Sequence, residues 1–154
     1  MTRHFYDAAN SHNVPSEVYA AVPIDGQFAW SESEQKRMDK IIRYTVLGGA
    51  AAAHSARAID IEVGDRANDP NFYMPFLIER NKHYGDATPY VNRSNLLVVS
   101  QHCHKAGILQ DMRFWISTLD GTIMRGAWAT QLQGGFHSPF DLSILQGVDD
   151  FVQP

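Results

Sequence analysis

Short apolar runs alternate with helix-forming segments along most of the chain, and this alternation constrains the fold more than any other feature. Strands separated by single helices pair in parallel through right-handed crossovers. The pattern predicts an α/β protein, and an open doubly wound sheet and a closed barrel both satisfy it. A full eight-unit barrel takes about 250 residues, whereas this chain has 154, so a barrel would need missing or shortened helices. Strands are expected at 5–8, 19–24, 43–47, 58–63, 89–91, 114–118 and 127–132.

A first helix is expected to begin after Ser31. Ser31 and Glu34 have the spacing of a capping box, in which each side chain bonds the backbone N–H of the other residue. Met38, Ile41 and Ile42 follow at the spacing of one helix face. The helix is therefore expected to extend through these three residues.

Two longer helices are expected in the middle of the chain. The segment 69–83 begins with Asp69-Pro70, and proline suits the first position of a helix. The segment 94–107 begins with a serine and ends in Gly107, a residue that commonly terminates helices.

Composition excludes several classes of protein. The content of 44% hydrophobic and 19% charged residues is that of a folded globular chain, and 1–154 is expected to form a single domain. A net charge of -4 without a polybasic run argues against a nucleic-acid partner. No segment approaches the roughly 20 apolar residues of a membrane span, and the first residues carry no apolar core of a signal peptide. The single cysteine excludes an intrachain disulfide.

The stretch AIDIEVG, residues 58–64, places Asp60 and Glu62 in a run of apolar β-branched residues. Side chains two positions apart on a strand project from the same face, so the two carboxyl groups are expected side by side. Such crowding raises the pKa of one carboxyl group, as a general acid near neutral pH requires. A structural role is the alternative, in which the pair caps a helix or binds Arg57 and Arg66.

Further acidic residues follow other expected strands, namely Asp7, Asp120 and Asp141. Functional groups of parallel α/β proteins gather at the carboxyl ends of the strands, so the sequence predicts a pocket lined by carboxylates. Glycoside hydrolysis uses such a pocket. One carboxylic acid protonates the leaving oxygen, and a second carboxylate acts as base, nucleophile or charge stabiliser.

Aromatic residues lie at or just beyond the ends of the expected strands. Flat apolar rings of this kind stack beneath sugars in carbohydrate sites, and their alternative role is core packing. They are Phe28, Trp30, Tyr90, Trp115 and Trp128. The segment QHCHK lacks the ligand spacing of a zinc site, so no metal site is expected there.

The order of these motifs resembles that of the family 25 glycoside hydrolases, the lysozymes of bacteria and phages, and of related glycoside-hydrolase-like domains of actinobacteria and their phages. The resemblance implies a compact, shortened TIM-like β/α barrel with a mainly parallel sheet. It is carried by the segments FYDAAN, IDIE, TPYVNRS, FWIST, AWATQLQ and FDLSIL. The late Trp-Gln-Tyr of the family is replaced here by Trp-Ala-Thr-Gln.

The resemblance also implies roles for individual residues. Glu62 is similar to the general acid, Asp60 to its partner, and Asp7 and Asp141 to outer carboxylates that position substrate or stabilise charge. The implied substrate is the glycan of bacterial peptidoglycan, cut between its amino sugars, and no cofactor or metal is implied. The expected substrate-binding residues are Tyr90, Trp115, Trp128 and Gln131.

A second function is compatible with the same sequence. The barrel could be a catalytically weak or inactive glycan-binding module, or a structural component of a phage virion or tail. Without a signal peptide, the chain is expected in the host cytoplasm, released to the cell wall, or as part of a phage particle. Release of reducing ends from peptidoglycan separates hydrolysis from binding.

Overall fold

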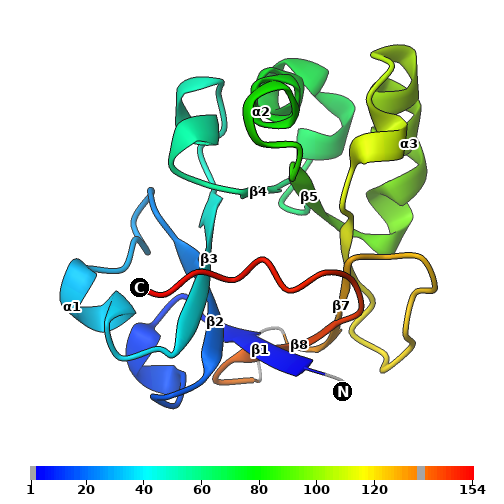
Figure 1. Ribbon diagram of the computed structural model, residues 1–154. Coiled ribbons are helices and arrows are strands. Elements are labelled where there is room, and N and C mark those ends of the chain that lie inside the picture. Colours follow the sequence, from blue (N-terminus) through cyan, green and yellow to red (C-terminus); the bar gives the residue numbers. More distant parts are fainter. Residues whose placement is uncertain (1–2, 135–137) are drawn as a thin grey trace.

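Strands in the described part of the chain close into an eight-stranded barrel (Figure 1). The structure is a computed structural model, and it describes residues 3–134 and 138–154. Neighbours in the barrel follow the order of the chain, so each strand pairs with the next and the last pairs with the first. The strands are β1 (Arg3–Asp7), β2 (Tyr19–Pro23), β3 (Lys40–Thr45), β4 (Ala58–Asp60), β5 (Thr88–Asn92), β6 (Trp115–Ser117), β7 (Ala129–Gln133) and β8 (Asp141–Leu145).

The barrel combines parallel and antiparallel pairing. Strands β1 to β7 pair in parallel, whereas β8 runs antiparallel to both β7 and β1. The segment between β7 and β8 is too short for a crossover, which takes a dozen or more residues, so the chain turns back on itself. The prediction of a shortened α/β barrel is confirmed, with the correction that its closing strand is antiparallel.

Long helices cover only one side of the barrel. Helix α2 (Pro70–Tyr84) connects β4 to β5, and α3 (Leu96–Lys105) connects β5 to β6. Figure 1 shows both helices over the same side. No helix within the described residues is long and apolar enough to cross a membrane. The remaining helical turns are short: α1 (Glu32–Gln35), η1 (Ser11–Asn13), η2 (Ala51–His54), η3 (Arg66–Asn68), η4 (Arg93–Asn95) and η5 (Leu109–Asp111).

The expected first helix is much shorter than predicted. Its capping box is present, because Ser31 N donates to Glu34 Oε2 at 2.7 Å and Glu34 N donates to Ser31 Oγ at 3.4 Å. The helix nevertheless ends at Gln35, and Ile41 and Ile42 belong to β3. Both isoleucines are buried, and a strand that is covered on both faces is apolar on both faces. The prediction of a helical face was therefore wrong.

Strand β8 was absent from the predicted set, which placed Asp141 after the last strand. Asp141 is instead the first residue of β8. Leu145 and Ser143 point into buried surroundings, while Leu142 and Ile144 are only partly buried. This alternation of burial is that of a strand with one face on the core.

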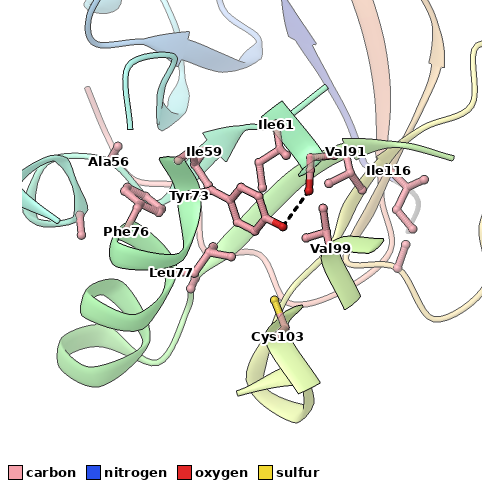
Figure 2. Packing of buried hydrophobic residues seen from close by; sticks show 14 residues of the cluster. Ala56, Ile59, Ile61, Tyr73, Phe76, Leu77, Val91, Val99, Cys103 and Ile116 are labelled. Carbon is pink, nitrogen blue, oxygen red and sulfur yellow. Dashed lines mark hydrogen bonds between the residues drawn. The ribbon is translucent and has the colours of Figure 1, made fainter. Parts of the chain in front are cut away.

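Three clusters of buried apolar residues hold the barrel together, and one of them packs Trp30 and Met38 against β2 and β3. The interior is filled mainly by aromatic rings, with Phe5 and Trp115 in edge contact at a centroid distance of 5.1 Å. A second layer lies between the outer face of the barrel and the two long helices (Figure 2). There the Tyr73 hydroxyl donates to Ala67 O at 3.1 Å, which satisfies a polar group that would be costly to bury alone. The packed interior leaves only the ends of the barrel for a site.

Candidate active site

A pocket of about 460 Å³ opens at the carboxyl ends of the parallel strands. Four acidic residues from three parts of the chain line it, namely Asp7, Asp60, Glu62 and Asp141. These four side chains were expected to meet at one mouth of the barrel, and all four line this pocket. Tyr90 lies among them on the pocket wall.

Strand register determines which of these side chains are neighbours. Asp7 ends β1 and Asp141 begins β8, and the two residues are directly opposite in the antiparallel pair. Residues opposite in such a pair have side chains on the same face, about 4.5–5.5 Å apart at Cβ. Asp60 ends β4 and is paired with Tyr90 of β5. The barrel therefore brings two carboxyl pairs to the same end.

Asp60 is held by the backbone that follows it. Its Oδ1 accepts a hydrogen bond from Glu62 N at 3.0 Å, and its backbone oxygen accepts one from Arg66 Nη1 at 3.3 Å. Burial raises the pKa of Asp60, whereas the bond from Glu62 N and the charge of Arg66 oppose that rise. The suggested pairing with Arg57 is not formed, because that guanidinium pairs with Asp150.

Glu62 has the carboxyl group best suited to donate a proton at neutral pH. Burial is the main cause that raises its pKa to about 7, and the charges of Asp60 and Asp141 act in the same direction. The hydroxyl groups of Tyr90 and Ser117 act against this rise in pKa. A carboxylic acid with this pKa is still largely protonated at the pH where ordinary glutamates are ionised.

Asp7 and Asp141 form the second carboxyl pair. Burial raises the pKa of Asp7 well above its ordinary value, and the neighbouring Asp141 contributes next through its charge and a hydrogen bond. The charges of Glu62 and Asp60 add to this effect. Asp7 is therefore the member of this pair whose ionised form is disfavoured, because it is buried beside another carboxyl group.

Of the residues expected to bind substrate, Tyr90 lines the pocket, whereas Trp115 and Gln131 lie behind it. The Tyr90 hydroxyl donates to Gln131 Oε1. Trp115 packs against the Tyr90 ring at a centroid distance of 4.1 Å, and its Nε1 donates to Ser143 Oγ at 3.0 Å. Gln131 and Trp115 are almost completely buried, so they support Tyr90 from within the barrel and do not line the mouth.

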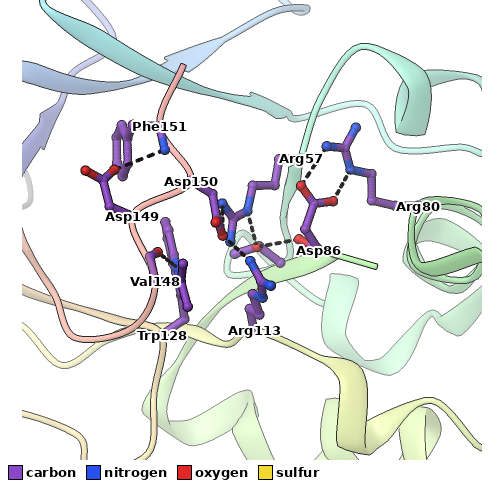
Figure 3. A network of polar contacts seen from close by, with 10 residues as sticks. Arg57, Arg80, Asp86, Arg113, Trp128, Val148, Asp149, Asp150 and Phe151 are labelled. Carbon is purple, nitrogen blue, oxygen red and sulfur yellow. Dashed lines mark hydrogen bonds and ion pairs between the residues drawn. The ribbon is translucent and has the colours of Figure 1, made fainter. Parts of the chain in front are cut away.

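Trp128 lies at the other end of the barrel, contrary to the expectation that it lines the mouth (Figure 3). It directly precedes β7 and therefore belongs to the amino end of that strand. There its Nε1 donates to Val148 O at 2.9 Å, and its ring lies 4.3 Å from the Arg57 guanidinium. Trp128 was predicted to follow a strand and so to lie at the mouth. Residues that precede parallel strands lie at the amino end of the barrel instead.

Of the other aromatic and acidic candidates, some line the pocket and others do not. Phe28 lines the pocket with about half of its side chain exposed, whereas Trp30 is buried and donates from Nε1 to Ala8 O at 3.2 Å. Asp120 does not line the pocket and pairs with Arg93 at the surface, 3.1 Å apart. Of the three, Phe28 alone retains access to a ligand in the mouth.

Sequence reasoning missed several residues of the pocket. Tyr44 of β3 lines it, and burial together with the nearby carboxyl groups raises the pKa of its hydroxyl. Arg66 also lines it, although the sequence analysis considered this residue only as an ion-pair partner. Leu47 and Val63 form an exposed apolar rim. The available signal was position in the sequence, because Tyr44, Leu47 and Val63 lie near the end of a strand or shortly after it.

No group of three histidine, cysteine or acidic side chains in the described ranges is arranged to hold a metal ion. The pocket instead presents carboxyl groups with raised pKa values beside aromatic and apolar surface. This combination is suited to proton transfer and to the stabilisation of a developing positive charge.

Comparison with solved structures places the chain in a known fold. A muramidase from Acremonium alcalophilum superposes with a TM-score of 0.57 and 14% sequence identity, over 96% of this chain and 95% of that chain. A bacterial lysozyme from Streptomyces coelicolor superposes with a TM-score of 0.57 and 13% identity, over 96% and 93%. No family model and no curated protein sequence matches the chain. The chain thus shares its barrel fold with these two structures.

Proposed function

We propose that the protein is a glycoside hydrolase that cleaves the glycan of bacterial peptidoglycan, as a muramidase does. The observation that carries the proposal is the meeting of Asp7, Asp60, Glu62 and Asp141 in one pocket, with the pKa of Glu62 raised to about 7. The fold shared with a muramidase and a bacterial lysozyme supports the same reaction class.

Glu62 is the general acid in this proposal. Its protonated carboxyl group donates to the glycosidic oxygen as the bond to the leaving sugar breaks. The hydroxyl groups of Tyr90 and Ser117 lower the pKa of Glu62, whereas burial raises it. With the pKa at about 7, the acid is substantially protonated near neutral pH and can still release its proton.

Asp60 supplies negative charge next to the acid. The backbone N–H of Glu62 and the guanidinium of Arg66 both favour its ionised form. An ionised carboxylate stabilises the positive charge that develops on the sugar in an oxocarbenium-like transition state. Asp7 and Asp141, on the opposite wall, would position the substrate or share in this stabilisation.

The apolar rim provides a surface for sugar rings and their substituents. Phe28, Leu47 and Val63 expose between 49% and 63% of their surface beside the carboxyl groups. Burial of apolar area against a ligand contributes roughly 25 cal/mol per Å². These residues would bind the faces of sugars on either side of the cleaved bond.

The proposal is tested by incubating the purified chain with actinobacterial peptidoglycan and measuring both released reducing ends and protein that sediments with the polymer. Hydrolysis predicts an increase in reducing ends that scales with enzyme and time. Sedimentation without new reducing ends would contradict hydrolysis and support a glycan-binding module. Neither binding nor cleavage would exclude both functions and leave a structural role.

A further inference from the structure

A second pocket, of about 210 Å³, lies at the amino end of the barrel, opposite the carboxylate mouth. Its walls come from the segments that lead into β4 and β5, from β3, and from the C-terminal tail. Three guanidinium groups line it, from Arg43, Arg57 and Arg80, against two carboxylates, from Asp86 and Asp150. The pocket is therefore of opposite electrostatic character to the mouth.

Arg57 is the buried member of this group, with only 5% of its side chain exposed. Its Nε donates to Thr88 Oγ1 at 3.0 Å, and its guanidinium lies 4.3 Å from the Trp128 ring. Nη1 is 2.7 Å from Asp150 Oδ2 as an ion pair, without the alignment of a hydrogen bond. Nη2 has no hydrogen-bond partner among the described residues. A buried cationic donor without a hydrogen-bond partner lowers the stability of the folded state.

The charges around Arg57 do not balance (Figure 3). Arg80 and Asp86 form a self-contained pair, with Nε to Oδ1 at 2.5 Å and Nη2 to Oδ2 at 2.9 Å. Asp150, in contrast, is shared by Arg57 and Arg113. Two cations therefore face one carboxylate, and one positive charge remains in excess next to the pocket.

We propose that this pocket binds a small tetrahedral oxyanion of the phosphate class, held by the Arg57 guanidinium. The planar guanidinium presents paired N–H donors that match the oxygens of such an anion. The anion would neutralise the excess charge, and it would reach Nη2, which is closed to solvent in the empty pocket, once the side chains around it shift. Ser55 and Arg43 lie at the rim of the pocket, where they add a hydroxyl and a further positive charge. The volume exceeds the roughly 30 Å³ of one water several-fold.

Binding at this position has a consequence for stability. The oxyanion would bind only the folded chain, because Arg57, Arg80 and Asp150 come from separate segments. A ligand that binds the folded state alone raises the melting temperature as its concentration passes Kd. The effect is independent of glycan cleavage, since the pocket is at the far end of the barrel from Glu62.

The test uses the full chain and inorganic phosphate. Tm is measured over a phosphate titration and over sodium chloride at matched ionic strength, and Kd is measured by calorimetry. Saturable binding is expected, with Tm rising by about 5 to 10 °C at a phosphate concentration a hundredfold above Kd. An equal response to phosphate and chloride, with no heat of binding, would overturn the proposal.

Two variants locate the site without disturbing the buried arginine. Arg113→Gln leaves Asp150 to Arg57 alone and removes the excess charge, and Ser55→Glu places a carboxylate at the exposed rim. Each is expected to weaken phosphate binding by roughly tenfold or more. The matched control Arg125→Gln removes one exposed positive charge outside the pocket and should leave Kd unchanged. An unchanged Kd in either pocket variant would overturn the proposed location.

Discussion

At the scale of single residues, Glu62 illustrates how its surroundings set the chemistry of a side chain. Burial is the largest cause of its raised pKa, and the adjacent Asp60 is the second. The same two causes act on Asp7, where Asp141 is the neighbour. The pocket therefore contains carboxyl groups whose pKa values are raised by burial and by neighbouring carboxyl groups, and a raised pKa is what a general acid needs.

Tyr90→Phe tests the Tyr90 hydroxyl, which opposes the rise in the pKa of Glu62. Loss of the hydroxyl removes a contact that lowers the pKa of Glu62, so the pKa should rise. In a profile of kcat/KM against pH, the alkaline limb should move to higher pH. A limb that moves to lower pH would contradict the assigned contact.

At the scale of secondary-structure elements, the C-terminal tail closes the amino end of the barrel. Val152 and Ile41 exchange backbone hydrogen bonds of 2.7 and 3.0 Å across an antiparallel bridge. The Phe151 ring lies 5.1 Å from that of Phe5 and 6.0 Å from that of Trp128. The tail is thus part of the folded core, and it brings Asp150 to the arginines of the second pocket.

Phe151→Ala should therefore destabilise the protein by about 3 kcal/mol, as expected when a buried phenyl ring is removed. The free energy of unfolding, measured by urea titration, provides the check. Val148→Ala is the matched control from the same tail, because its side chain is 64% exposed and its change should stay within about 0.5 kcal/mol. Equal effects of the two changes would show that the ring does not anchor the tail.

Gly134 follows β7 and allows β8 to place its first residue in the mouth. A Cβ at this position would collide with the Asp141 carboxylate and lie 2.7 Å from Gln131 Nε2. Gly134→Ala should therefore displace Asp141 and reduce glycan cleavage by about tenfold or more. Gly85→Ala is the control, since its Cβ meets nothing within 4 Å and only its left-handed backbone is strained. Full activity in Gly134→Ala would contradict a role for Asp141.

The elements differ in how far the sequence predicts them. The helix that begins at Pro70 was correctly placed, because the Asp69-Pro70 pair at its start is a local signal. Strand β3 was partly assigned to a helix, because the isoleucine spacing fits a helix face and a strand buried on both sides equally well. Strand β8 was missed because its pairing with β1 joins the two ends of the chain, which no local pattern contains.

At the scale of the whole molecule, the two ends of the barrel have opposite electrostatic roles. The carboxyl end gathers acidic groups with raised pKa values, and the amino end gathers arginines. Much of the acidic site was predictable, because residues that follow parallel strands share one end. The buried positions of Trp115 and Gln131 were not predictable, because the order of motifs along the chain does not specify how deep a side chain lies within a barrel.

The acidic end should make stability depend on pH. Because the pKa of Glu62 is raised to about 7 in the folded state from 4.5, the folded chain binds more protons than the unfolded chain between these values. Its contribution to stability is complete below about pH 4.5 and is lost as the pH rises through about 7, a change of roughly 3 kcal/mol. The raised pKa values of Asp7 and Asp60 add a dependence of the same sign.

Urea titrations at about pH 4.5 and about pH 8 check this dependence. Wild type should be less stable at the higher pH. Glu62→Gln cannot ionise, so its free energy of unfolding should exceed that of wild type by roughly 3 kcal/mol at the higher pH and match it at the lower. Parallel pH curves for the two proteins would show that Glu62 titrates normally.

The central claim is that Glu62 donates the proton that cleaves a glycan, and the most direct measurement is the release of reducing ends from peptidoglycan by wild type and Glu62→Gln. At about pH 6 the wild-type carboxyl group is mostly protonated, so the substitution preserves charge and shape. Turnover should fall by roughly 10²–10⁴-fold, with glycan binding unchanged. Glu32→Gln, at an exposed carboxylate of α1, should retain full turnover. Cleavage by Glu62→Gln at the wild-type rate would contradict the claim.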